Sequence, residues 1–242
     1  GTFHADEVTA CALLIFFNLI DKDKIIRTRD PDRLDRCEYV CDVGGFYLPE
    51  KKRYDHHQLE YEGKWSSAGM VLHDLLERKV VSSAEYHHLN DLLVIGVDQH
   101  DNGIEIKEVG VTTFSHVIAN FNPIRYDAGA EERAVLFMEA VTFAERHIAS
   151  LITRYRYNCS CLDTVRERMQ TDERCLIFDQ AMPWMESFFA LGGEEHQALF
   201  VIMPTGEHWK LRGIPPSLDQ RMDVRMPLPD LWAGHLERDL RD

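Results

Sequence analysis

The chain has 242 residues and a mass of 28.1 kDa, a length that suits one large domain or two modest ones, and we expect two. Its formal net charge of −14 excludes a protein that coats nucleic acid through a broad basic face, because neutralising phosphates requires clustered lysine and arginine. The longest apolar run, "ACALLIFFNLI", is interrupted by Asn18 and followed by Asp21, so we expect no membrane span.

The first part of the chain alternates helical and strand patterns, which predicts an α/β fold with a mostly parallel sheet flanked by helices. Helices are predicted over residues 5–20, 66–79 and 84–103. Residues 24–29 and 38–45 are predicted as short strands, the second ending in a glycine turn. Asp42 is therefore expected at a carboxyl strand end, the edge at which α/β sheets bind ligands.

A long helix is predicted over residues 128–158, where it links two domains. The first domain is expected over residues 1–127. The second is expected over residues 159–242 as a smaller α/β (α+β) domain. Its predicted strands are residues 174–179, 198–203 and 208–214.

The six cysteines show no C-x-x-C pair and no spacing typical of a disulfide framework, which favours a reducing, cytoplasmic location. Cys159 and Cys161 are interpreted as ordinary thiols. No secretory signal segment is recognised, and an organellar location stays open if the native chain begins earlier.

Four clusters of histidine and carboxylate side chains lie at predicted turns or element ends. They are "FHADE" (His4, Asp6, Glu7), "CDVGG" (Asp42), "YDHHQ" (Asp55, His56, His57) and "VDQHDNG" (Asp98, His100, Asp101). Each cluster alone is typical of a helix cap or a surface turn. His87 and His88, which lie within a helical stretch without a carboxylate turn, are interpreted as structural. Together they indicate a metal site for Mn²⁺, Mg²⁺, Fe²⁺ or Co²⁺. Two ions would need a bridging carboxylate, for which Asp42 is the candidate, and would favour in-line hydrolysis of a phosphoester.

The motif "YDHHQ", preceded by "CDVGGFYLPEKKR" and followed by "KWSSAGMVL" and "DNGI", resembles the DHH phosphoesterase superfamily. Within it, the sequence is similar to the melanocyte proliferating gene family of metal-dependent 3′-5′ RNA exonucleases. The resemblance continues through "RTRDP", "MPWME" and "RMPLPDLWAG" and covers nearly the whole chain. It implies a DHH-type catalytic domain followed by a substrate-binding domain.

The resemblance also implies the roles of individual residues. The metal ligands would be His4, Asp6, Asp42, His56 and Asp98 or Asp101. His57 would contact the substrate phosphate, and Asp55 would orient its neighbours. Family members usually carry another His-containing turn ahead of the position of Gly1, which would supply a further ligand of the first metal site.

Three further residues have two interpretations each. Ser66 and Ser67 either cap a helix or bind a phosphate through free amides and a hydroxyl. Arg225 either clamps a distant phosphate of the substrate, which is the interpretation we favour, or braces the "PLPDLWAG" segment.

These features predict a Mn²⁺-dependent phosphodiesterase with two ions, Mg²⁺ or Co²⁺ being alternatives. The expected substrate is RNA or a short oligonucleotide cleaved as a 3′-5′ exonuclease. A small-molecule nucleotide or pyrophosphate hydrolase and a non-catalytic metal or nucleotide sensor are alternatives. The oligomeric state is left open, a homodimer being one alternative.

Overall fold

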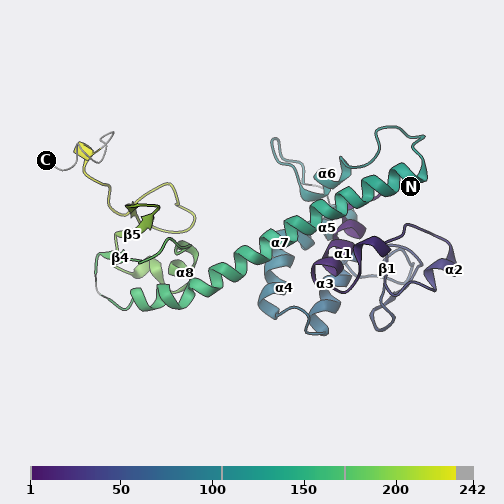
Figure 1. The fold of residues 1–242 in the computed structure, drawn as a ribbon, viewed down its shortest axis with the longest axis horizontal. Helices are drawn as coiled ribbons and strands as arrows, with labels where there is room; N and C mark the ends of the chain where they lie inside the picture. Colours follow the sequence, from purple (N-terminus) through teal and green to yellow (C-terminus); the bar gives the residue numbers. More distant parts are fainter. Residues whose placement is uncertain (1, 105, 172, 233–242) are drawn as a thin grey trace. The chain divides into compact units, whose positions relative to one another are not determined.

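The computed structural model describes residues 2–104, 106–171 and 173–232. Contacts between residues divide the chain into two compact units, residues 1–153 and 154–242 (Figure 1). The boundary lies within a single long helix, α7 (Ala130–Arg168), which supplies buried side chains to both units. Each unit is described by itself below.

The core of the first unit is formed by helices. These are α1 (Ala5–Phe16), α3 (Ser67–Glu77), α4 (Ser83–Leu89), α5 (Ile95–Asp101), α6 (Phe114–Ala119) and the first part of α7. A π-helical turn over Asn90–Val94 joins α4 to α5, so the helical segment predicted over residues 84–103 is confirmed with a change of winding inside it. Fully buried Val8, Leu72, Val141 and Ile148 show how α1, α3 and α7 bury apolar faces in one core.

The sheet of the first unit is small and mixed. Its strands are β1 (Val40–Cys41), β2 (Tyr47–Leu48) and β3 (Arg53–Tyr54), in the order β1-β3-β2. β1 pairs with β3 in parallel, and β2 pairs with β3 antiparallel. The α/β class is confirmed, and the expected mostly parallel sheet is replaced by one parallel and one antiparallel pair. Cys41 ends β1, so Asp42 does lie at a carboxyl strand end.

The strand predicted over residues 24–29 is not formed. Lys22–Lys24 is a 3₁₀ turn, and the following residues pair with no strand among the described residues, although Ile25 is extended (φ −71°, ψ 129°). A side chain holds this segment instead. Arg27 lies over the rings of Phe3 and Phe137, with centroid distances of 5.4 and 5.0 Å. The local pattern gave an extended chain, but no neighbouring strand was there to pair with it.

The second unit carries its own three-stranded sheet. Its strands are β4 (Cys175–Ile177), β5 (Phe200–Thr205) and β6 (His208–Gly213), in that order. β4 and β5 are parallel, and β5 and β6 are antiparallel. The short helix α8 (Met185–Ala190) and the end of α7 share a core with one face of this sheet, in which Phe188 and Val201 are fully buried. A 3₁₀ turn over Gly193–Glu195 follows α8, and another over Asp230–Trp232 lies near the end of the described chain.

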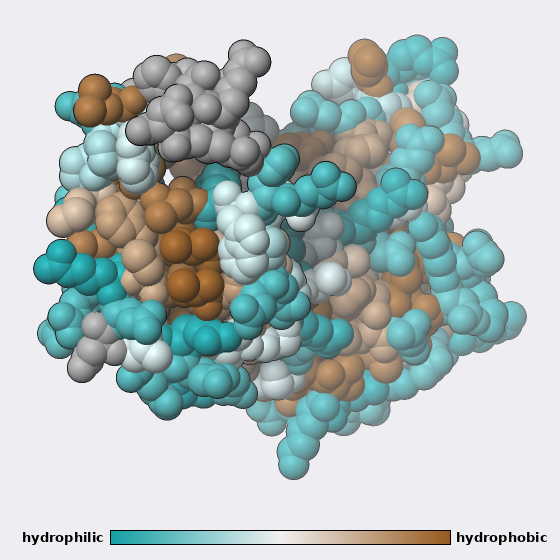
Figure 2. Space-filling view, turned by 60° about the vertical axis from the view of Figure 1, so that its left-hand side comes forward, coloured by the Kyte–Doolittle hydropathy of each residue, from teal (hydrophilic) through white to brown (hydrophobic). Residues whose placement is uncertain are grey.

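Apolar side chains remain exposed on the second unit. Ile177 and Trp209 expose 42% and 60% of their surface, and Figure 2 shows apolar patches amid a mostly hydrophilic face.

Among the described residues, no helix combines the length and the apolar character that crossing a bilayer requires.

Candidate metal centre

The end of the parallel strand pair brings the "YDHHQ" motif next to Asp42. Cys41 is in register with Tyr54, so Asp42 and Asp55 leave the same edge of the sheet. Asp42 adopts a left-handed backbone (φ 61°), a conformation that aspartate tolerates better than most residues, and its amide donates to the carbonyl of Tyr54 at 3.0 Å. This fixed turn places the Asp42 carboxylate 3.6 Å from both His56 Nε2 and His57 Nδ1.

The N-terminus of α1 contributes the second part of the cluster. His4 is the N-cap of this helix, and its amide donates to Glu7 Oε2 at 2.8 Å. Asp6 lies in the first turn with only 1% of its surface exposed, and its Oδ2 is 4.0 Å from His56 Nε2. A helix N-terminus favours negative charge, which helps to keep these carboxylates inside the fold.

The C-terminal end of α5 contributes the third part. Asp101 is the last residue of α5, and its Oδ2 lies 3.0 Å from His56 Nε2 while its Oδ1 lies 3.8 Å from His4 Nδ1. Three overlapping groups of ligand atoms, each within 4.8 Å, result. They are Asp42, His56 and His57; His4, Asp6 and Glu7; and Asp6, His56 and Asp101. The predicted ligands His4, Asp6, Asp42, His56 and Asp101 thus converge from three separate segments.

Buried polar atoms in this cluster fit a metal. Both carboxylate oxygens of Asp6 are buried without a hydrogen-bond partner, and the Nε2 atom of His56 is buried among the carboxylates of Asp6, Asp42 and Asp101. Leaving such groups unpaired costs free energy, and a buried carboxylate is normally paired or bound to a cation. A set of carboxylate and imidazole ligands without cysteine suits Mn²⁺, Mg²⁺ or Co²⁺. Asp6 and His56 each belong to two of the three groups, whereas Asp42, the predicted bridge, belongs to one, so Asp6 is the carboxylate placed to be shared between ions.

The pKa shifts of the cluster residues are those expected of a site that binds a cation. Burial raises the pKa of Asp6 well above its ordinary value, and the nearby Glu7, Asp42 and Asp101 raise it further. Burial also raises the pKa of Glu7. Hydrogen bonding to Asp101 and then to Asp42 raises the pKa of His56 to about 10. Without a metal, protons compensate the carboxylates, and a divalent cation would compete with them.

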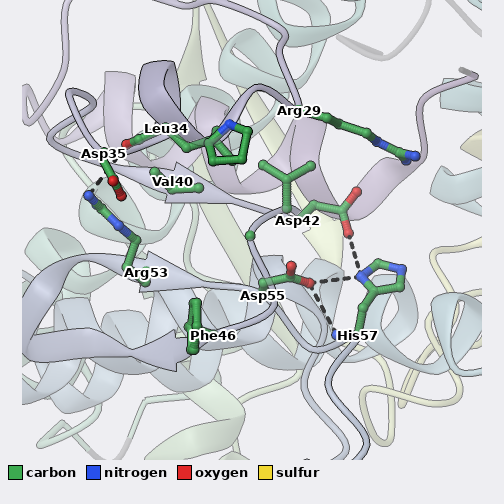
Figure 3. Close-up of a pocket in the computed structure, with 12 residues that line it drawn as sticks. Arg29, Leu34, Asp35, Val40, Asp42, Phe46, Arg53, Asp55 and His57 are labelled. Carbon is green, nitrogen blue, oxygen red and sulfur yellow. Dashed lines mark hydrogen bonds and ion pairs between the residues drawn. The ribbon is translucent and has the colours of Figure 1, made fainter.

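Asp55 holds His57 and the glycine turn rather than joining the cluster. Its Oδ1 lies 2.8 Å from His57 Nδ1 and accepts the amide of His57 at 3.1 Å, while its Oδ2 accepts the amide of Gly45 at 2.6 Å (Figure 3). Burial alone would raise the pKa of Asp55, but these hydrogen bonds outweigh it and lower that pKa below its ordinary value. The contacts are those expected of an orienting residue. The imidazole of His57 is 63% exposed, with Nε2 left to meet a ligand.

The remaining predicted residues of the first unit lie away from the cluster. The Oδ1 atom of Asp98 accepts hydrogen bonds from the hydroxyl of Ser66 at 2.6 Å, the amide of Ser66 at 3.1 Å and the amide of Gly69 at 3.0 Å. Ser67 donates to the carbonyl of Tyr54 at 2.8 Å. Both serines are fully buried. Asp98 therefore satisfies the N-terminus of α3 in place of a serine side chain. Ser66 is the N-cap by position, but neither serine hydroxyl caps the helix, and both are used within the fold instead of being free for a phosphate.

Arg225 is occupied by its own unit. Its guanidinium donates to the carbonyls of Pro215 at 3.1 Å, Ala198 at 3.1 Å and Gly193 at 2.6 Å, among others, and lies 5.5 Å from the ring centroid of Phe188. Its N–H donors are thus already bonded to backbone carbonyls of the second unit. These contacts favour the bracing interpretation over a phosphate clamp.

Sequence reasoning left three residues near the cluster without a role. Glu7 joins His4 and Asp6 in one ligand group, and its place one residue after Asp6 at a helix start was the available signal. Arg27 and Arg29 come from the "RTRDP" segment and line a cavity of about 790 Å³ together with His4, Glu7 and His57. Arginine beside a metal cluster is a signal for an anionic substrate.

Comparisons with known proteins agree with the motifs. The MYG1_exonuc family model, described as "Uncharacterised protein family (UPF0160)", matches residues 1–242. A MYG1 protein of Chlamydia pneumoniae is 50% identical over 99% of this chain and 82% of its own length. The human MYG1 exonuclease is 29% identical over 97% of this chain and 73% of its own length. No solved structure matches significantly. The resemblance to the melanocyte proliferating gene family is confirmed: this chain belongs to the MYG1 family.

Proposed function

We propose that this protein is a metal-dependent phosphodiesterase of the DHH type that acts as an exonuclease on RNA or short oligonucleotides. One observation carries the proposal. The unpaired buried oxygens of Asp6 lie in a cluster completed by Asp42, His56 and Asp101, beside the exposed His57. This is the ligand chemistry of a hard divalent cation next to a group that can contact a phosphate.

Asp6, Asp42, His56 and Asp101 would hold the metal, with His4 and Glu7 as further ligands, and Mn²⁺ is our first candidate. When bound, it would supply Lewis-acid stabilisation of the negative charge that develops on a phosphoryl group. Two ions are part of the proposal because the three ligand groups overlap at Asp6 and His56. The cation would also remove the cost of keeping several carboxylates buried together.

His57 is the residue that would contact the substrate phosphate. Asp55 Oδ1 accepts the Nδ1–H of His57 at 2.8 Å, which orients the ring and leaves Nε2 towards the substrate. Nε2 donates to a phosphoryl oxygen when the ring is the doubly protonated imidazolium. Hydrolysis adds water across one P–O ester bond and releases a phosphomonoester and an alcohol. A preoriented donor stabilises the charge that the phosphoryl oxygens gain as that bond breaks.

The names of relatives support the exonuclease part of the proposal. The human, rat and mouse relatives are each named MYG1 exonuclease and are 29% identical to this chain over 97% of its length. The cavity of about 790 Å³ beside the cluster has room for part of a nucleotide chain, and its arginines suit phosphates. A single chain end held in this cavity needs few basic contacts, which reconciles the net charge of −14 with a nucleic-acid substrate.

The test is a metal-supplemented hydrolysis screen over short RNA, short DNA, dinucleotides, mononucleotides and pyrophosphate. We expect oligonucleotide cleavage with Mn²⁺ and none after chelation. Asp42→Asn should abolish it, whereas the matched change Asp23→Asn, on an exposed 3₁₀ turn, should not.

Cleavage of pyrophosphate or mononucleotides alone would replace the exonuclease by a small-molecule hydrolase. Metal binding without turnover on any of these substrates would contradict an enzymatic function.

A further inference from the structure

A second, smaller cavity adjoins the metal cluster. It has a volume of about 460 Å³, within the range of small-ligand sites, and lies between β1, the glycine turn and the short helix α2 (Pro31–Leu34) (Figure 3). Asp42 and His57 line both cavities, as does Arg29. Both cavities are therefore within reach of a substrate bound at the cluster.

The smaller cavity has polar and apolar lining. In Figure 3 the polar ends of Arg29, Asp42 and His57 lie together on one side, and Leu34, Val40 and Phe46 lie toward the other, where Asp35 and Arg53 also line the cavity. A nucleotide combines the same two characters, because its phosphate is anionic and its base is flat and largely apolar on its faces.

The guanidinium of Arg29 makes no hydrogen bond or ion pair among the described residues. Two nearby arginines, Arg27 and Arg53, differ in this respect. Arg27 lies 3.9 Å from Glu7 and packs on two rings. Arg53 donates to the carbonyls of Cys37 at 3.1 Å and Glu38 at 3.2 Å and so holds the loop after α2 against β3. Of the two arginines that line this cavity, Arg29 is therefore the one whose N–H donors are available to a ligand, and a phosphate is a suitable acceptor for them.

Phe46 is an aromatic side chain left exposed at the cavity. It exposes 60% of its surface, although its backbone is fixed, because its carbonyl accepts the amide of Asp55 at 3.0 Å. Asp55 is also the residue that orients His57 at 2.8 Å. Asp55 therefore holds both the backbone that carries the ring at the cavity and the histidine at the cluster. An exposed aromatic ring on a fixed backbone is a feature on which nucleic-acid bases stack.

We propose that this cavity binds the terminal nucleotide of the substrate, with Phe46 stacking on its base and Arg29 pairing with its phosphate. The inference rests on the proposed function, because it assigns a subsite to the same substrate. It makes Phe46 and Arg29 positioning residues that place the terminal phosphodiester at the cluster.

The test measures binding of adenosine 5′-monophosphate, adenosine and inorganic phosphate to the Mn²⁺-loaded protein by calorimetric titration. Phe46→Ala should weaken the monophosphate and adenosine by about fivefold or more and leave phosphate unchanged. Phe46→Trp, which keeps an aromatic face, should retain both. Arg29→Gln should weaken the monophosphate and phosphate by about tenfold and leave adenosine unchanged. Arg33→Gln, on exposed α2 and outside both cavities, is the matched control and should change nothing.

Wild-type affinity for the monophosphate in both Phe46→Ala and Arg29→Gln would overturn the subsite, as would a wild-type protein that binds no monophosphate. Melting temperatures of the same samples show that the variants are folded. Mn²⁺-dependent cleavage by the wild type is measured in parallel. Normal cleavage with unchanged affinities contradicts the subsite alone, whereas the expected affinity pattern without any cleavage contradicts the proposed function alone.

Discussion

At the scale of single residues, the adjacent histidines of the "YDHHQ" motif have different surroundings. His56 is directed into the cluster, where its side chain is 11% exposed and its Nε2 lies 3.0 Å from Asp101. His57 is 63% exposed and is held from behind by Asp55. Neighbouring residues of one type can therefore serve two purposes, because the extended chain after β3 turns successive side chains in different directions.

This division predicts different defects for two alanine variants. His56→Ala should weaken Mn²⁺ binding, because it removes a ligand that two of the groups share. His57→Ala should keep Mn²⁺ affinity near the wild-type value and lower kcat on the order of 100-fold, as for the loss of one donor to a developing anion. Mn²⁺ titration and steady-state kinetics check both. Equal loss of metal in the two variants would show that the roles are divided wrongly.

The raised pKa of His56 predicts a pH dependence for metal binding. With its pKa raised to about 10, His56 is protonated in the metal-free protein at neutral pH and must lose that proton to become a ligand. Mn²⁺ affinity should therefore increase as pH rises from 6 towards 9, by about tenfold per pH unit for each proton released. Calorimetry in buffers of different ionisation enthalpy measures the proton release. An affinity that stays flat across this range would contradict the assignment of His56 as a ligand.

At the scale of elements, the cluster depends on three chain segments that end at one place. The parallel pairing of β1 with β3 sets Asp42 and His56, the N-terminus of α1 sets Asp6, and the last residue of α5 sets Asp101. A separate contact joins α5 to α3. Asp98, three residues before Asp101 in α5, accepts hydrogen bonds from amides at the N-terminus of α3.

The contact between α5 and α3 predicts stability effects that are separate from metal binding. Asp98→Ala should lower the free energy of unfolding by about 2–4 kcal/mol, because it leaves the hydroxyl and amide of Ser66 and the amide of Gly69 buried without acceptors. Gly69→Ala should also destabilise the protein, since a Cβ there would overlap the Asp98 carboxylate. Denaturant unfolding measures both. Loss of Mn²⁺ affinity in folded Asp98→Ala, with unchanged stability, would instead make Asp98 a ligand.

In the second unit, Arg225 is expected to act through the fold. Arg225→Ala should lower the stability of this unit by about 2–4 kcal/mol, because several charge-assisted hydrogen bonds to carbonyls are lost together. Arg225→Lys should restore little, since an ammonium cannot span the same carbonyls. Thermal unfolding, with cleavage rates on a series of oligonucleotide lengths, checks this. Normal stability with a defect confined to longer substrates would support the phosphate clamp.

At the scale of the whole molecule, the sequence predicted those features that depend on neighbouring residues alone. Helix patterns, the glycine turn and the strand end at Asp42 could be read from the sequence, and the "YDHHQ" motif placed His56 and His57 at the site. Contacts between distant segments could not be read. Asp98 belongs to the same "VDQHDNG" motif as Asp101, and the Ser66 that it meets lies about 30 residues earlier, so the role of Asp98 at the N-terminus of α3 appears only in the fold. Arg225 and residues 24–29 differ from expectation for the same reason.

The proposed function requires that a divalent cation binds at the cluster of Asp6, Asp42, His56 and Asp101. Asp6 is the residue to change, because it is 1% exposed and both of its oxygens are unpaired. Asp6→Asn keeps the shape and removes the buried charge, so the metal-free variant should be at least as stable as the metal-free wild type.

The most direct measurement is equilibrium dialysis against Mn²⁺, with the bound metal quantified by mass spectrometry, for the wild type, Asp6→Asn and the exposed control Asp23→Asn. We expect the wild type and the control to bind Mn²⁺ alike and Asp6→Asn to bind at least about tenfold more weakly, with an undiminished melting temperature in the metal-free state. Equal Mn²⁺ binding by the wild type and a folded Asp6→Asn variant would contradict the metal centre.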